Sequence, residues 1–78
     1  MTFAIDVFFR PGSNINEDAL ISQATQSGGH LDFREPAGID DTSICLTFEF
    51  SSLTQAQSTV DILKTNEIHI EGPYEYGN

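Results

Sequence analysis

The chain has 78 residues, of which twelve are Asp or Glu and three are Lys or Arg, so its formal net charge is −9. Phosphate backbones and anionic membranes bind positive surfaces that displace counterions, so this charge argues against nucleic acid and membrane as partners. A basic protein is the natural complement, although a net charge far from zero also keeps a small domain soluble.

A single cysteine, Cys45, excludes an internal disulfide and any zinc site built on several cysteines. The first residues lack the basic start and apolar run of a signal peptide, and no segment approaches the roughly 20 apolar residues of a membrane helix. We therefore expect a single domain over residues 1–78, near the lower size limit for unaided folding, in a reducing, cytoplasmic location.

The first predicted element is a half-buried β-strand over residues 2–10, because its side chains alternate in character. One face carries Phe3, Ile5, Val7 and Phe9, and the other carries Ala4, Asp6, Phe8 and Arg10. Pro11-Gly12 ends the strand, since proline cannot donate to the ladder and glycine relaxes the turn.

A short helix follows, with Asn14 as its N-cap and Glu17 three residues later in a near relative of the capping box. Its inward stripe consists of Leu20, Ile21 and Ala24. Gly28-Gly29 supplies the left-handed residue that ends it. Ser, Thr and Gln are frequent here, so packing rather than helix propensity must hold the helix together.

Residues 30–35 predict a second strand, with Leu31 and Phe33 inward and with His30, Asp32 and Arg34 outward. Pro36 limits this strand, and residues 36–42 form a polar connection with Asp40-Asp41 at its tip.

The second half repeats the pattern strand, helix, strand. Residues 44–50 place Ile44, Leu46, Phe48 and Phe50 inward and Cys45, Thr47 and Glu49 outward. Ser52 with Gln55 forms a capping box, and the helical spacing then continues with Leu53, Ala56, Val60 and Leu63. Lys64 suits the last turn, and Asn66 is expected as its left-handed cap. The last strand covers residues 67–71, with Ile68 and Ile70 inward and His69 outward.

The order βαββαβ, with right-handed crossovers, favours an α+β ferredoxin-like sandwich. Its four-stranded antiparallel sheet would have the order 4-1-3-2, with both helices on one face. Residues 1–72 form the core, and the Gly72-Pro73 break leaves residues 73–78 as a tail. Two tyrosines in this tail, Tyr74 and Tyr76, either extend the last strand, fold back over an apolar edge or anchor an interface.

The sheet face without helices gathers the outward side chains and is the candidate interaction face. Its members are Asp6, Phe8, Arg10, Arg34, Thr47, Glu49 and His69. Three interpretations stay open: a solvated face whose charges balance one another, a surface that packs against a partner with Phe8 as its apolar anchor, or a site for a small ligand or acid–base chemistry.

Several specific activities find no support in the pattern. His30 and His69 fall on opposite edge strands, roughly 14 Å apart, which is too far to share a zinc ion. Cys45 lies among carboxylates, which raise rather than lower a thiol pKa. No catalytic, metal or cofactor motif is present. The outward side of strand 44–50 carries Cys45, Thr47 and Glu49 rather than the aromatic residues on which RNA-recognition domains stack bases.

We expect a non-enzymatic interaction or regulatory domain that self-associates, as a homodimer, through the open face or an edge strand. The first alternative is an acidic inhibitor or immunity-type protein that caps a basic target. The second is a small-molecule-binding domain or enzyme centred on Asp6, Arg10, Arg34 and Glu49, which requires a concave site on that face.

Overall fold

The structure, a computed structural model, describes residues 1–38 and 43–76 and contains the predicted order of elements. These are β1 (Thr2–Phe9), α1 (Glu17–Gln26), β2 (His30–Glu35), β3 (Ile44–Phe50), α2 (Leu53–Leu63) and β4 (His69–Tyr76). The predicted Asp40-Asp41 tip lies outside the described residues. None of the helices in the described part of the chain is long and apolar enough to cross a membrane.

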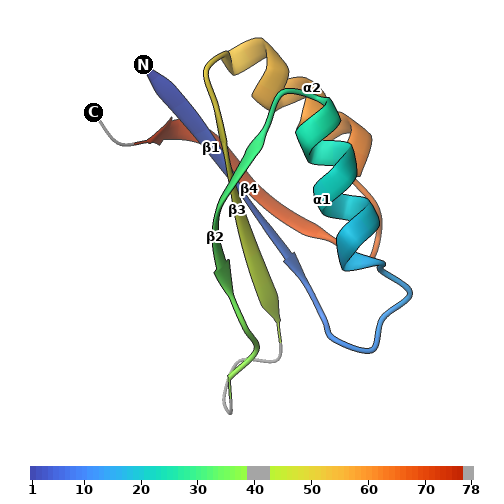
Figure 1. The fold of residues 1–78 in the computed structure, drawn as a ribbon. Helices are drawn as coiled ribbons and strands as arrows, with labels where there is room; N and C mark the ends of the chain where they lie inside the picture. The colour runs from blue at the N-terminus through green and yellow to red at the C-terminus, as the bar shows by residue number, and fades with distance from the viewer. Residues whose placement is uncertain (39–42, 77–78) are drawn as a thin grey trace.

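The four strands form one antiparallel sheet in the order β2-β3-β1-β4, which is consistent with the predicted order counted from the opposite edge. Both helices pack on the same side of this sheet, as Figure 1 shows, and leave the other side without a helix. We call that uncovered side the open face. β1 and β3 lie in the centre, and β2 and β4 form the two edges.

The core lies between the two central strands and the helices. The alternation predicted for these strands is confirmed, because their inward side chains are buried: Ile5, Val7, Phe9, Ile44, Leu46, Phe48 and Phe50. Leu20 and Ala24 of α1 and Ala56 and Leu63 of α2 close this layer from the helix side. The period-two pattern of β1 and β3 is therefore what fixes which face becomes the core.

Helix α1 starts two residues later than the sequence pattern predicts. Its N-cap is Asn16, whose side chain Oδ1 accepts a hydrogen bond from the Ala19 backbone N–H at 3.0 Å. The prediction of Asn14 was wrong because both asparagines precede the acidic first turn, and only Asn16 is three residues from a free helical N–H. Gly28, at a φ of 102°, ends the helix as predicted.

Helix α2 begins as predicted, with the Ser52 side chain accepting a hydrogen bond from the Gln55 backbone N–H at 3.3 Å. Leu53, the first residue of the predicted helical spacing, is 51% exposed, whereas Thr59, which lies outside that spacing, is fully buried. Thr59 tolerates burial because its hydroxyl donates to the Gln55 carbonyl at 2.8 Å. The helix closes at an extended Lys64, so the left-handed cap expected at Asn66 is not formed.

Strand β2 contains an irregularity that reverses the orientation of its second half. The pairing with β3 shifts register between Leu31 and Phe33, so Phe33 pairs with the open-face residue Thr47 and is 54% exposed. Arg34 then pairs with the core residue Leu46. The predictions of Phe33 inward and Arg34 outward were wrong, because a bulge adds one residue and inverts every following side chain.

Strand β4 continues through the Gly72-Pro73 pair to Tyr76, so the residues expected as a tail belong to the sheet. A bulge in the β1–β4 pairing between Ala4 and Asp6 accommodates the pair. Gly72 has a φ of 103°, and a Cβ there would lie 2.7 Å from the Ala4 carbonyl oxygen, so only glycine fits. A proline is tolerated beside it because β4 is an edge strand.

The two candidate caps of α1 give a direct test of this geometry. Replacing Asn16 by Ala removes the acceptor for the Ala19 N–H and should lower the free energy of unfolding by about 1 kcal/mol. The matched variant Asn14→Ala, at an exposed position before the cap, should stay within about 0.5 kcal/mol of the parent protein. Urea unfolding followed by circular dichroism measures the free energy of unfolding of both variants. A larger loss of stability in Asn14→Ala than in Asn16→Ala would place the cap at Asn14.

Candidate functional site

The open face is built from residues that are paired across the strands and therefore point to the same side. In the first row Ala4 lies between Glu49 and Tyr74, in the second Asp6 lies between Thr47 and Glu71, and in the third Phe8 lies between Cys45 and His69. Strand β2 extends these rows with His30, Phe33 and Glu35. The face thus combines aromatic rings with carboxylates.

Asp6 is the centre of a hydrogen-bond network on this face. The Thr47 hydroxyl donates to Oδ1 of Asp6 at 2.6 Å, and the Tyr74 hydroxyl donates to Oδ2 at 2.9 Å. Thr47 is almost fully buried, so this network lies partly below the surface. Both carboxylate oxygens are thereby held by residues of the neighbouring strands, which fixes the side chain of Asp6.

The two tyrosines of β4 lie over the open face rather than on a free tail. Tyr76 donates to the Asp32 carboxylate of β2, and the rings of Tyr74 and Tyr76 meet edge to face with centroids 6.2 Å apart. Ala4, directly opposite Tyr74, is fully buried although it points to this side of the sheet. Of the three options left open by the sequence, extension of the last strand occurs, because the residues up to Tyr76 pair with β1.

The environment of these hydroxyls favours their protonated form. Burial, followed by the hydrogen bond to Asp6 and its negative charge, raises the pKa of Tyr74 to about 12. The hydrogen bond to Asp32 raises the pKa of Tyr76, and burial adds to that shift. Both tyrosines therefore act as hydrogen-bond donors at neutral pH, and neither is poised to lose a proton in catalysis.

The other end of the face carries the aromatic pair Phe8 and His69, whose ring centroids lie 5.7 Å apart at a tilt of 38°. The exposed imidazole Nε2 of His69 is also 3.2 Å from Oε2 of Glu71. Cys45, on the same row, has its thiol pKa raised by burial and then by the charge of Asp6. This environment favours the thiol over the thiolate, so Cys45 is not activated as a nucleophile.

Electrostatically the open face is acidic. Five carboxylates share it: Asp6, Asp32, Glu35, Glu49 and Glu71. Within the described strands no Lys or Arg points to this side, because the β2 bulge turns Arg34 to the helix side of the sheet. There Arg34 forms a two-pronged ion pair with Glu17 of α1, at 2.7 and 3.1 Å.

The predicted interaction face is thus brought together except for its two arginines. Asp6, Phe8, Thr47, Glu49 and His69 share the open face, whereas Arg34 leaves it and Arg10 lies in the exposed turn after β1. The set Asp6, Arg10, Arg34 and Glu49 is therefore not assembled into one site. Among the residues the structure describes, no group of three or more His, Cys, Asp or Glu side chains is placed to hold a metal ion.

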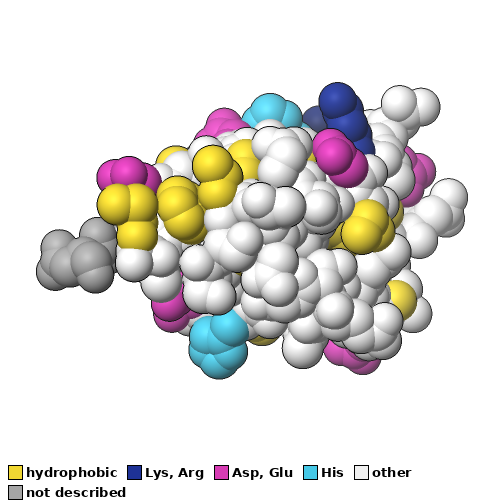
Figure 2. Space-filling view, turned by 90° about the horizontal axis from the view of Figure 1, so that it is seen from above, with side chains coloured by type: hydrophobic (Ala, Val, Ile, Leu, Met, Phe, Trp, Pro, Cys, Tyr) yellow, Lys and Arg dark blue, Asp and Glu magenta, His cyan; other side chains and the backbone are white. Residues whose placement is uncertain are grey.

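Figure 2 views the molecule from above, with the sheet side and the termini at the left. Hydrophobic side chains gather there in a band, and acidic side chains border that band. Toward the right in this view, basic, acidic and isolated hydrophobic side chains are scattered among the white atoms. Apolar and acidic groups are thus neighbours on the left of this view.

Comparisons with known proteins give no further guide: no family model, no curated protein and no solved structure matches the chain.

Sequence reasoning missed three members of the face: Phe33, Glu35 and the bound hydroxyl of Tyr74. Phe33 and Glu35 depend on the β2 bulge, for which the sequence gives no turn or glycine signal. The alternation of Tyr74 and Tyr76 did indicate a strand, but the Gly72-Pro73 pair before it pointed to a break.

The Tyr74 hydrogen bond predicts a specific titration. In the variant Tyr76→Phe, which leaves Tyr74 as the single tyrosine, tyrosinate absorbance should rise around pH 12 rather than around the ordinary value of 10. Adding Asp6→Asn should lower this pKa only part of the way, because burial is the larger cause.

The raised pKa of Tyr74 also makes the stability of the folded protein depend on pH. A tyrosine whose pKa is raised on folding stabilises the folded state fully below its unfolded pKa, and that contribution is lost as the pH rises through the folded pKa. For Tyr74 the loss falls between about pH 10 and 12. A titration of the folded variant centred near 10 would contradict the hydrogen bond to Asp6.

Proposed function

We propose that this protein is a non-enzymatic interaction domain whose open face binds a basic segment of another protein. The observation that carries the proposal is the composition of that face, where five carboxylates surround exposed aromatic rings without a Lys or Arg from the described strands. The net charge of −9 adds a long-range attraction toward a positive partner.

The arrangement suits the side chains of arginine and lysine in two ways. Carboxylates such as Glu49 and Glu71 accept hydrogen bonds from a guanidinium or an ammonium group. Aromatic faces such as those of Phe8 and Phe33 attract the same cations through their ring quadrupoles. Phe33, at 54% exposure, offers the apolar contact that an acidic surface alone would lack.

The carboxylate of Asp6 already has hydrogen-bond donors within the protein. Asp6 is fixed by the Thr47 and Tyr74 hydroxyls, so a partner does not have to satisfy it. Glu49, by contrast, has no hydrogen-bond or ion-pair partner among the described residues, and Glu71 contacts only the exposed imidazole of His69. These two carboxylates are the ones we assign to the partner.

Self-association of the domain is the second proposal, and the face supports it less well. Two open faces in contact would bring the carboxylates of one copy against those of the other, which opposes a dimer at neutral pH. The edges are also interrupted, by the bulge of β2 and by the Gly72-Pro73 pair and bulge of β4. The arrangement of two helices over an antiparallel sheet supports a ferredoxin-like fold, which we propose as its class.

Binding of a basic peptide tests the main proposal. We expect a fluorescently labelled synthetic peptide, in which arginine alternates with alanine, to bind with an affinity that falls steeply between low and high salt. The open-face double variant E49Q/E71Q should weaken this binding by about three- to tenfold. Fluorescence anisotropy gives both values.

A matched control separates the open face from the overall charge. The variant D18N/D61N also removes two negative charges, but from exposed positions on the helices. It should leave the affinity for the peptide within about twofold of the parent protein's. Equal weakening by both double variants would mean that net charge alone attracts the peptide. Absence of binding at low salt would remove the proposed function.

Sedimentation velocity tests self-association separately. We expect a monomer at micromolar concentration at neutral pH, because apposed carboxylates repel each other. If instead a dimer forms and the variant E49Q/E71Q strengthens it, the open face is a contact between copies and the basic-partner proposal loses its support.

A further inference from the structure

A hollow of about 600 Å³ lies at the end of the sheet where β1 stops and β4 begins. The turn after β1 contributes Arg10 and Ser13, the segment before β4 contributes Asn66 and Glu67, and the rings of Phe8 and His69 form one wall. Its volume falls within the roughly 300–1,000 Å³ typical of small-molecule sites.

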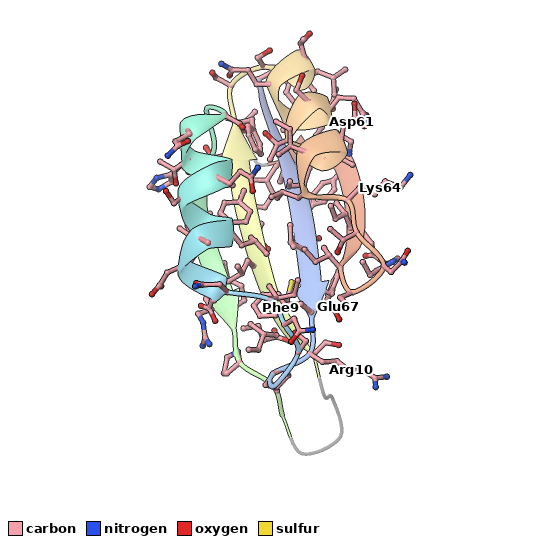
Figure 3. The ribbon with its side chains drawn as sticks, turned by 90° about the vertical axis from the view of Figure 1, so that its right-hand side faces the viewer. Phe9, Arg10, Asp61, Lys64 and Glu67 are labelled. Atoms are coloured by element: carbon pink, nitrogen blue, oxygen red, sulfur yellow. The ribbon has the colours of Figure 1, made fainter. Side chains whose placement is uncertain are left out.

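Two opposite charges line this hollow without pairing to each other. Arg10 and Glu67 are both exposed, and neither forms an ion pair with any residue that the structure describes. This differs from the other arginine, Arg34, whose guanidinium is held by Glu17 at 2.7 Å. Figure 3 shows Arg10 and Glu67 at the same end of the molecule, next to Phe9.

The remaining lining adds apolar surface and one polar group. The tilted pair of Phe8 and His69 offers ring faces and edges against which a planar or apolar group can pack. The side-chain amide of Asn66 has no hydrogen-bond partner among the described residues. Ser13 is already engaged, since its hydroxyl donates to the Arg10 carbonyl at 2.7 Å.

The charges restrict the ligand. A guanidinium binds a carboxylate in two-pronged geometry, whereas the carboxylate of Glu67 repels any ligand that is purely anionic. A purely cationic ligand meets the reverse problem at Arg10. A molecule that carries a carboxylate, an ammonium group and an aromatic ring is complementary to all three parts of the lining.

We propose that this hollow is a binding site for an aromatic α-amino acid. The carboxylate lies against Arg10, the ammonium group against Glu67, and the ring against Phe8 and His69. The site shares the ring of Phe8 with the proposed binding of a basic segment, but its charged groups are Arg10 and Glu67 rather than Glu49 and Glu71 of the open face.

Titration of the isotope-labelled full chain with L-phenylalanine, followed by amide chemical shifts, tests the proposal. We expect saturable shifts at millimolar concentration, centred on residues 10–13 and 66–69. L-Alanine, which lacks the ring, and phenethylamine, which lacks the carboxylate, should each bind about tenfold more weakly. No saturable shift with L-phenylalanine, or equal binding of all three compounds, would overturn the site.

Charge-neutralising variants give opposite effects on one further probe, 3-phenylpropionate, which has the ring and the carboxylate but no ammonium group. Arg10→Gln should weaken both L-phenylalanine and this probe by about tenfold. Glu67→Gln should weaken L-phenylalanine but strengthen 3-phenylpropionate, because the repulsion of its carboxylate is removed. If Glu67 had only a structural role, Glu67→Gln would weaken the binding of both ligands instead of weakening one and strengthening the other.

Lys64→Gln and Asp61→Asn are the matched controls, since Figure 3 shows Asp61 on α2 and Lys64 just after its C-terminal end, away from Arg10 and Glu67. Each should leave L-phenylalanine binding within about twofold. The variant Glu49→Gln, at an open-face position outside the lining of the hollow, should also leave L-phenylalanine binding unchanged and should weaken only the peptide, so loss of peptide binding and loss of amino acid binding are distinguished. If Lys64→Gln weakens the ligand as much as Arg10→Gln does, the carboxylate is not bound at the hollow.

Discussion

The pairing of β1 with β3 is the constraint on which the rest of the structure depends. Seven residue pairs join these strands in continuous antiparallel register, from Phe3 with Phe50 to Phe9 with Ile44. Because side chains alternate in a strand, this register places the large apolar residues of both strands on the helix side, with Phe8 as the exception on the open face. It also places Asp6 beside Thr47 and Ala4 beside Glu49 on the other side. The core and the acidic open face are thus two results of one pairing.

The edge strands modify this arrangement through irregularities in pairing. The β2 bulge moves Phe33 to the open face and sends Arg34 to Glu17, so an apolar side chain is gained by the face and a positive charge is lost. The β4 bulge lets the strand continue past Gly72, and Tyr74 then reaches Asp6. Together the two bulges convert a face of mixed charge into an acidic one with aromatic contacts, which is the basis for proposing a basic partner.

Charge pairing divides the protein into regions with different chemistry. Arg34 stabilises the contact between β2 and α1, and Asp6 is held by hydroxyls within the sheet. Unpaired charges among the described residues include carboxylates on the open face, and Arg10 with Glu67 at the end of the sheet. An internally satisfied group stabilises the fold, whereas an unpaired charge in a hollow or on a flat face is available to a ligand.

The sequence by itself determined the order of elements, the inward faces of β1 and β3 and the cap of α2, because alternation, helical spacing and a capping serine are local signals. It also indicated that Asp6, Phe8, Thr47, Glu49 and His69 share one face. Only the tertiary structure decided the positions of Phe33, Arg34 and Tyr74. A bulge depends on pairing with a neighbouring strand and leaves no periodic signal, yet it inverts every side chain that follows. The hollow beside Arg10 likewise arises where turns distant in sequence meet.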